Sequence, residues 1–171
     1  IRRGRAYDCA TISNVAIADK PGKVELNFLE DYWGSSSLHD IEKSFAGSKL
    51  GISTREKIQV DAVSLDSYFE KNGLLGKKCV VKMDIEGYEE FALTPAKKFF
   101  SSARAGNVKL FIEFTGSAYK SPEKLFNLLK ENFSGIDLIE DSGQRKKLKG
   151  YSDLKKVTTT TSDDWAMLYC Y

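Results

Sequence analysis

Two short apolar runs in the middle of the chain limit the folds that it can adopt. Residues 79–83 read CVVKM and residues 108–114 read VKLFIEF, and each run has the length of a buried strand. A helical stretch separates them, with Thr94 as its cap and Pro95 at the first helical position, where proline is favoured. This order and spacing predict a parallel βαβ unit with a right-handed crossover.

The region before this unit predicts two strands joined by a turn, and then a third strand. Residues 9–19 are rich in small and β-branched side chains, and residues 24–28 alternate between apolar and polar side chains. Between them, Pro21 and Gly22 occupy the second and third positions of a predicted type II turn. Residues 58–62 alternate again and predict the third strand.

Two further helices are predicted from the residues at their ends. The segment SLDSYFEKNG begins at a cap formed by Ser64 or Asp66 and ends at Gly73. The segment SPEKLFNLLKENF, residues 121–133, opens with a capping serine and a proline in its first turn. Its large apolar side chains fall on one face, so we expect this helix to pack against a sheet.

The last two strands are predicted at residues 136–140 and 165–170. A long polar loop containing RKKLKGYSDLKK joins them, and β-propensity places the threonine run at 158–161 at the start of the final strand. Because no helix is predicted in this loop, we expect the two strands to be antiparallel neighbours.

Length and composition predict one soluble α/β domain over residues 1–171. The chain has 171 residues, 42% of them hydrophobic, which suffices for a single core. Its formal net charge is +2 and its acids and bases are interspersed, so neither nucleic acid nor an anionic membrane is an expected partner. No segment approaches the roughly 20 apolar residues that cross a bilayer.

The cysteines predict free thiols in a reducing, intracellular compartment. Cys9, Cys79 and Cys170 lie far apart and show no spacing that could cage zinc. Cys79 begins one predicted strand and Cys170 ends another, so we expect both to be small core residues rather than nucleophiles.

Acidic side chains follow the run at 79–83 directly, in the sequence DIEGYEEF. Ligands of open α/β sheets bind beyond the carboxyl ends of the parallel strands, so Asp84 and Glu86 are candidate catalytic residues. A carboxylate there can orient a cation, accept a proton from a hydroxyl or hold a metal. The alternative is that these acids cap the next helix and complement its dipole, which is our expectation for Glu89 and Glu90.

Glu113 is a third candidate catalytic residue. It lies inside VKLFIEF, where a carboxylate is costly unless it is paired or belongs to a site, and an edge position or a lysine partner would also explain it. His39 is the only histidine, and no nucleophile-elbow or phosphate-cradling motif accompanies it, so we expect it to be a surface residue. A metal-dependent hydrolase built on Asp84, Glu86 and Glu113 would therefore lack a histidine ligand.

The sequence KMDIEGYE at residues 82–89 resembles the KxDxEGxE signature of FkbM-type methyltransferases. Other segments resemble further parts of that family in the family's own order, over residues 9 to about 115. These segments are NVAIADKPGKVELNF (14–28), GSSSL (34–38), VDAVSLDSYF (60–69) and LFIEF (110–114).

The resemblance implies a Rossmann-like methyltransferase sheet, mostly parallel with an antiparallel carboxyl-terminal strand pair. It implies S-adenosylmethionine as the cofactor and a hydroxyl oxygen of a sugar, lipid-linked glycan or natural product as the methyl acceptor. Asp84 would then stand near the methyl group or the acceptor hydroxyl, with Glu86 beside it. Methyl transfer is an in-line displacement, so the protein aligns the reactants and accepts a proton from the hydroxyl.

The chain departs from the family pattern in ways that leave two functions open. The family's glycine-rich cofactor loop and ribose-binding acid would precede residue 1, so the sheet apparently lacks its first two strands. Thr115 stands where the family often has a histidine, and residues 93–96 replace the L-x-G-A that follows the signature. The chain is either the carboxyl-terminal part of a working methyltransferase or a pseudoenzyme that serves as a scaffold subunit.

An unpaired sheet edge follows from the absence of those two strands. Such edges tend to be covered by another chain or segment. We therefore expect a partner chain or a missing segment along the strand near Val15 and Ile17.

Overall fold

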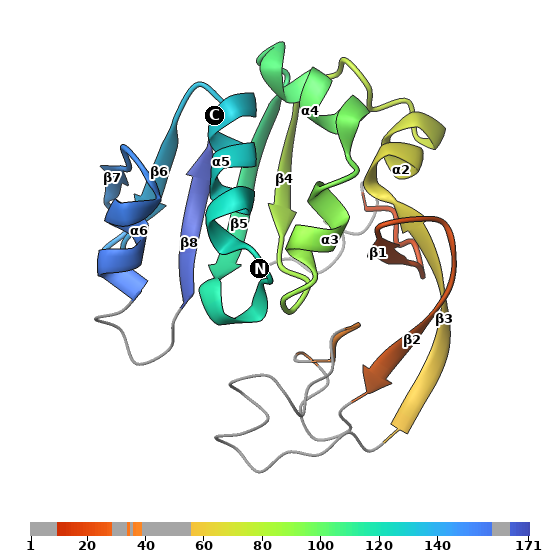
Figure 1. Cartoon of the computed structure of the whole chain (residues 1–171). Helices are drawn as coiled ribbons and strands as arrows, with labels where there is room; N and C mark the ends of the chain where they lie inside the picture. Colours follow the sequence, from red (N-terminus) through yellow and green to blue (C-terminus); the bar gives the residue numbers. More distant parts are fainter. Residues whose placement is uncertain (1–9, 29–33, 35, 39–55, 159–164) are drawn as a thin grey trace, which may run out of the picture.

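The computed structural model of this chain describes residues 10–28, 34, 36–38, 56–158 and 165–171 (Figure 1). The strands are β1 (Ala16–Ala18), β2 (Gly22–Phe28), β3 (Glu56–Ser64), β4 (Cys79–Met83), β5 (Val108–Thr115), β6 (Ile136–Ile139), β7 (Arg145–Lys147) and β8 (Trp165–Cys170). The helices are α2 (Leu65–Lys71), α3 (Glu89–Leu93), α4 (Lys97–Arg104), α5 (Pro122–Asn132) and α6 (Tyr151–Thr158), and a 3-10 turn, η4, spans Gly116–Ala118. Within the described ranges, every helix is too short or too polar to cross a bilayer.

The larger sheet has the strand order β4-β5-β8-β6-β7. Strands β4 and β5 are parallel, which confirms the predicted βαβ unit. Strand β8 lies between β5 and β6 and is antiparallel to both, so the prediction that the last two long strands are antiparallel neighbours is confirmed. The expectation of a mostly parallel sheet is wrong for the described strands, because β4–β5 is the parallel pair in this sheet and its other pairs are antiparallel.

Three local predictions around this sheet are wrong. The connection between β6 and β8 contains β7 and α6, although we expected no helix there, and Thr158 ends α6 instead of starting the final strand. The crossover from β4 to β5 is two helices rather than one. Thr94 is the carboxyl-terminal cap of α3, and α4 begins after Ala96, because Pro95 has no N–H with which to continue the first helix.

The smaller sheet has the order β1-β3-β2, with β3 in the centre. β1 runs parallel to β3, and β2 runs antiparallel to it. The two predicted strands are present, but they pair with β3 and not with each other. The predicted type II turn is not seen between them, because residues 19–21 form a bend and Gly22 already begins β2. The first of the two strands was predicted at residues 9–19 and is shorter, since within the described residues 10–19 the strand spans Ala16–Ala18.

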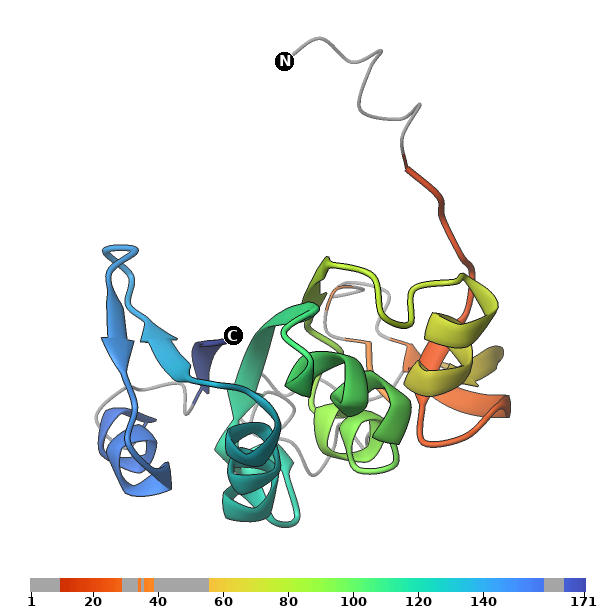
Figure 2. The ribbon, with the colours of Figure 1, turned by 90° about the horizontal axis from the view of Figure 1, so that it is seen from above.

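The core lies between the five-stranded sheet and the helices on one of its faces. Figure 2 shows α3, α4, α5 and α6 on the same side of this sheet. The large side chains buried there include Phe99 of α4, Phe126 of α5, and Leu110, Ile112 and Phe114 of β5. Alternation along β5 gives the opposite face to Phe111 and Glu113, which are only partly buried.

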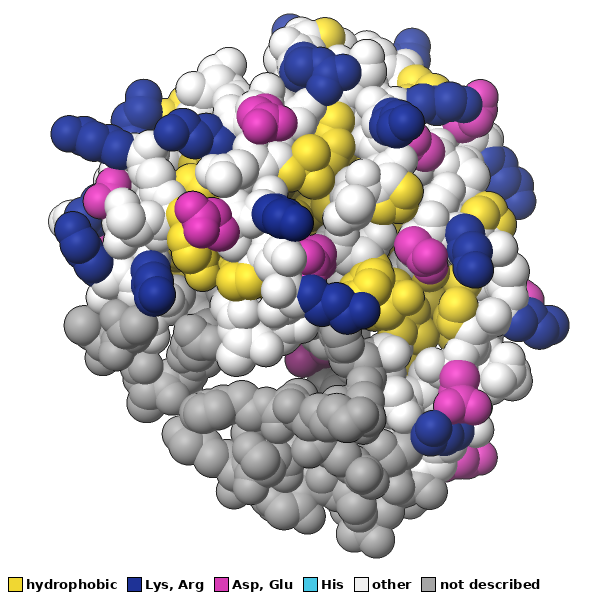
Figure 3. Space-filling view, in the orientation of Figure 1, with side chains coloured by type: hydrophobic (Ala, Val, Ile, Leu, Met, Phe, Trp, Pro, Cys, Tyr) yellow, Lys and Arg dark blue, Asp and Glu magenta, His cyan; other side chains and the backbone are white. Residues whose placement is uncertain are grey.

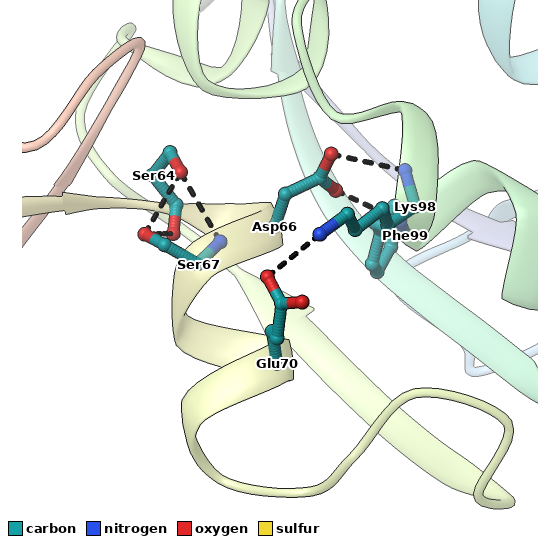
Figure 4. Close-up of polar contacts among 6 residues, drawn as sticks. All are labelled: Ser64, Asp66, Ser67, Glu70, Lys98 and Phe99. Carbon is teal, nitrogen blue, oxygen red and sulfur yellow. Dashed lines mark hydrogen bonds and ion pairs between the residues drawn. The ribbon is translucent and has the colours of Figure 1, made fainter.

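Helix α2 follows β3 of the smaller sheet, and hydrogen bonds from its first turn join it to the start of α4 (Figure 4). Ser64 caps α2 by accepting a bond from the Ser67 amide at 3.2 Å, and Gly73 follows its end with φ of 63°, as predicted. Asp66, the other predicted cap, instead accepts bonds from the Lys98 and Phe99 amides at the start of α4, at 3.0 and 2.8 Å. The Asp66 carboxylate therefore fixes the β3–α2 unit to the helix layer of the larger sheet.

Candidate functional site

The turn after β4 places Asp84 and Glu86 at the carboxyl end of the parallel strand pair. Glu86 has φ of 55° and Gly87 has φ of 90°, so two successive residues take a left-handed conformation that reverses the chain. This conformation is uncommon for a residue other than glycine, and such strain is concentrated at functional sites. The Ser37 hydroxyl donates a hydrogen bond of 2.7 Å to the Glu86 carbonyl oxygen and supports the turn from the serine-containing segment.

Strand register brings Glu113 beside Asp84. Met83 of β4 is paired with Ile112 of β5, and both side chains are buried toward the helices. The residues that follow this pair, Asp84 directly after β4 and Glu113 near the end of β5, therefore lie side by side, about 5 Å apart in the backbone. Because side chains alternate along a strand, both acids project away from the helix-covered face.

One cation lies close to these acids. The Lys82 ammonium forms an ion pair of 2.5 Å with the Asp84 carboxylate, and their side chains are 62% and 32% exposed. The charges of Asp84, Glu86 and Glu113 all raise the pKa of Lys82, although its hydrogen bond to Asp84 is the largest cause. Three acids therefore share one described lysine.

Desolvation and nearby like charges raise the pKa of two of the three acids. The pKa of Glu86 is raised to about 7, first by desolvation and then by the charges of Asp84 and Glu113. The Glu86 side chain is nevertheless solvent-accessible, so a ligand or a water molecule can reach it. The pKa of Glu113 is raised by desolvation and by Asp84, against the opposing charge of Lys82.

In Figure 3 an acidic side chain lies set back from the described surface below the helices, on the side of the molecule where β4 ends in Figure 1. Asp84, Glu86 and Glu113, the three candidates from the sequence, are thus brought together at one end of the larger sheet. His39 and Cys9 lie outside the described residues. Among the described residues, no group of three or more histidine, cysteine, aspartate or glutamate side chains is arranged to hold a metal ion.

Glu89 and Glu90 make contacts that the sequence analysis missed. Both lie in the first turn of α3, as expected, but Glu89 is only 1% exposed and bonds to the Ile85 amide and the Tyr119 hydroxyl. Glu90 accepts bonds from the Lys120 and Ser121 amides, directly before α5 begins at Pro122. These contacts add to the expected interaction with the dipole of α3, which agrees with the place of both acids in its first turn. The one sequence signal for Glu89 was its place as the last acid of KMDIEGYE.

The two described cysteines are free thiols that match the predicted core positions. Cys170 is buried at the end of β8, and Cys79 is partly buried at the start of β4. Burial raises the pKa of both thiols, so both are poor nucleophiles.

Comparison with known proteins gives one match. The model of a family described as the methyltransferase FkbM domain matches residues 2–162. This match includes the acid-bearing turn after β4, the smaller sheet and most of the carboxyl-terminal region. No curated protein and no solved structure matches the chain.

Proposed function

Because the chain belongs to the FkbM methyltransferase domain family, we propose that it takes part in methyl transfer from S-adenosylmethionine to a hydroxyl oxygen. The observation that carries this proposal is the group of three acids, Asp84, Glu86 and Glu113, at the carboxyl ends of β4 and β5. In open α/β sheets, ligands bind beyond the carboxyl ends of parallel strands, and β4 and β5 form such a parallel pair. The acceptor class that the family resemblance supports is a sugar, a lipid-linked glycan or a natural product.

The charge balance of the group fits a cationic ligand. Asp84, Glu86 and Glu113 outnumber Lys82, so a further positive charge would relieve the repulsion among the acids. When bound, S-adenosylmethionine supplies an electrophilic methyl group on a positively charged sulfur. We assign the acid group to the neighbourhood of that sulfur, and we assign no described residue to the adenosine.

Glu86 is the acid best suited to accept the proton of the acceptor hydroxyl. A general base works best when its pKa is near the working pH, and the pKa of Glu86 is raised to about 7. Its side chain is accessible, and the left-handed turn and the Ser37 hydrogen bond fix its backbone. Asp84, held by Lys82, and Glu113, on the next strand, can accept hydrogen bonds from other hydroxyl groups of the acceptor and so orient the reacting hydroxyl toward Glu86.

The proposal is tested by cofactor binding and by transfer of a labelled methyl group. Calorimetric titration with S-adenosylmethionine should be run on residues 1–171 and on a longer chain that carries an upstream extension. Binding by either chain, together with transfer of label to a hydroxyl-bearing acceptor that Glu86→Gln abolishes, is the expected result. Absence of cofactor binding by both chains would contradict it and would favour the alternative, a methyltransferase-like pseudoenzyme that acts as a scaffold subunit.

Two edge strands of the described sheets support pairing with a further strand. β1 and β4 each stand at one end of their strand order, and Val15 and Val80 beside them are 37% and 66% exposed. We therefore also propose that a strand from a partner chain, or from a segment outside residues 1–171, pairs along β1 near Val15 and Ile17. The free thiols of Cys79 and Cys170 support a reducing, intracellular setting for this assembly.

Sedimentation and hydrogen exchange test the paired edge. Residues 1–171 alone should self-associate through β1, and an added upstream segment should suppress this association and protect the β1 amides from exchange. A monodisperse monomer of residues 1–171 whose outward-facing β1 amides exchange freely would contradict the proposal.

A further inference from the structure

Glu89 is a buried acid to which the proposed reaction gives no role. Its side chain is 1% exposed, and the described residues provide no ion pair to it. One carboxyl oxygen, Oε1, accepts a hydrogen bond of 2.9 Å from the Ile85 amide in the turn that carries Glu86. The other, Oε2, lies 3.1 Å from the hydroxyl oxygen of Tyr119, which is itself only 7% exposed. Glu89 thus joins the turn after β4 to the segment that follows β5.

The hydroxyl group of Tyr119 has more acceptors around it than protons to give. It lies 3.0 Å from the Glu113 carbonyl oxygen and 3.1 Å from Glu89 Oε2, and the Thr115 amide donates to it from 3.4 Å. A tyrosine hydroxyl has one proton, so it can donate to only one of these two oxygens. With an ionised Glu89, one of the two short contacts would join two oxygen atoms with no hydrogen between them.

A proton on Glu89 Oε2 satisfies every contact in this network. The Glu89 carboxyl group then donates to the Tyr119 oxygen, and Tyr119 donates to the Glu113 carbonyl. The tyrosine oxygen accepts from Glu89 and from the Thr115 amide with its two lone pairs. Glu89 Oε1, the carbonyl oxygen of the neutral acid, accepts from the Ile85 amide.

We propose that Glu89 is a positioning residue that, in its protonated form and through Tyr119, holds the turn carrying Glu86 against the end of β5 that carries Glu113. The chain of contacts runs from the Ile85 amide through Glu89 and Tyr119 to the Glu113 carbonyl. It fixes the separation of two of the three acids at the sheet edge. Its consequence for catalysis rests on the proposed function, but its hydrogen-bond pattern does not.

The charged groups around Glu89 agree with a neutral acid. Desolvation raises the pKa of Glu89, and so does the charge of Glu113 on β5. The amides of Ile85 and of Glu89 itself and the Tyr119 hydroxyl oppose this rise but do not cancel it. From the turn after β4, Glu86 is a second acid close to Glu89, so ionising both would be costly.

The test measures the titration of Glu86 by carbon-13 NMR, which requires no catalysis. If Glu89 is already neutral, Glu89→Gln removes no charge, and the amide can donate to Tyr119 and accept from the Ile85 amide, so the Glu86 midpoint should equal that of the wild-type chain. A clear fall of that midpoint in Glu89→Gln would show that a negative charge had been removed, and it would overturn the proposal. Glu123→Gln, an exposed change on α5, is the matched control for loss of an acid elsewhere.

A second pair of variants tests the positioning role. Glu89→Ala and Tyr119→Phe each break the chain of contacts, so the turn should open, Glu86 should gain solvent, and its midpoint should fall toward the ordinary range. An unchanged midpoint in Tyr119→Phe, which keeps the volume of the ring, would overturn the role.

Methyl transfer then separates this proposal from the proposed function. Glu89→Gln should retain kcat, whereas Tyr119→Phe should lower kcat by about 100-fold with little change in KM, because the acids are misplaced. Equal loss of kcat in both variants would count against the positioning role. A wild-type chain that transfers no methyl group would contradict the proposed function, and the NMR titrations would still decide the state of Glu89.

Discussion

Two regions of the molecule place carboxylates in different surroundings. One is the joint between α2 and α4, and the other is the acid group at the carboxyl ends of β4 and β5. At the joint, Asp66 accepts two amide hydrogen bonds from the open end of α4, at 3.0 and 2.8 Å (Figure 4). At the sheet edge, Glu86 and Glu113 are desolvated and face other acids, and this raises the pKa of each. The Asp66 carboxylate is thus surrounded by hydrogen-bond donors, whereas the carboxyl groups of Glu86 and Glu113 are surrounded mostly by other negative charges.

This difference separates an acid that serves the fold from acids that serve a ligand. Amide donors at a helix start stabilise an ionised carboxylate, so removing Asp66 should cost stability. A carboxylate with like-charged neighbours costs stability, and such groups are characteristic of functional sites. Asp66 variants should therefore change unfolding, and Glu86 variants should change catalysis.

The largest expected effect is on catalysis. Glu86→Gln keeps the shape of the side chain but removes the proposed base, so methyl transfer should fall by about 100-fold or more. Denaturant unfolding of this variant should show no loss of stability. Glu70→Gln, an exposed acid on α2, is the matched control and should leave transfer unchanged. Full activity in Glu86→Gln would remove Glu86 from the proposed mechanism.

The next effect is on the fold. Asp66→Ala removes the acceptor of two amide bonds at the start of α4, so the free energy of unfolding should fall by about 2 kcal/mol. Denaturant titration followed by circular dichroism measures this loss, and Asp66→Asn should recover part of it. A loss as small as that of an ordinary surface substitution would show that α4 does not depend on this cap.

Part of the architecture and the location of the site were predictable because they depend on local pattern. The apolar runs of β4 and β5 gave the parallel pair, and the acids after β4 followed from its end. The capping residue Ser64 and the terminal Gly73 of α2 were also predictable, since each acts within its own helix. In each of these cases, the residues that decide the structure lie within a few positions of one another.

The errors arose where a distant residue decides the structure. Asp66 was a reasonable cap for α2, but its donors are 32 and 33 positions away at the start of α4. Glu89 looked like an acid at a helix start because Tyr119, its partner 30 residues later, carries no sequence signal of that role. The helix α6 was missed for a different reason. Its sequence is rich in lysine, so the single large apolar residue that it buries, Leu154, did not stand out as a helical pattern.

A smaller effect should appear in the pH dependence of stability. The folded chain holds a proton on Glu86 up to a pH of about 7, whereas the ordinary value for glutamate is 4.5. The contribution of this group is therefore full below about pH 4.5 and is lost as the pH rises through 7. Because the side chain is accessible, solvent screening limits the loss to about 1 kcal/mol or less.

Unfolding measured on both sides of pH 7 tests that slope. Glu86→Gln cannot ionise, so its stability should change less than that of the wild-type chain over this range. The difference between the two chains should shrink when salt is added, because part of it comes from the charges of Asp84 and Glu113. Identical pH profiles of the two chains would show that ionisation of Glu86 does not lower the free energy of unfolding.

The smallest effect belongs to the ion pair that lies beside Asp66 at the joint. Lys98 and Glu70 are joined at 2.7 Å, but their side chains are 51% and 59% exposed, so water already solvates both charges. A double-mutant cycle with Lys98→Ala and Glu70→Ala should give a coupling of about 0.5 kcal/mol or less, and added salt should reduce it further. A coupling as large as the loss in Asp66→Ala would mean that the joint is held by its exposed charges. The amide donors around Asp66 would then no longer distinguish this joint from the acid group at the sheet edge.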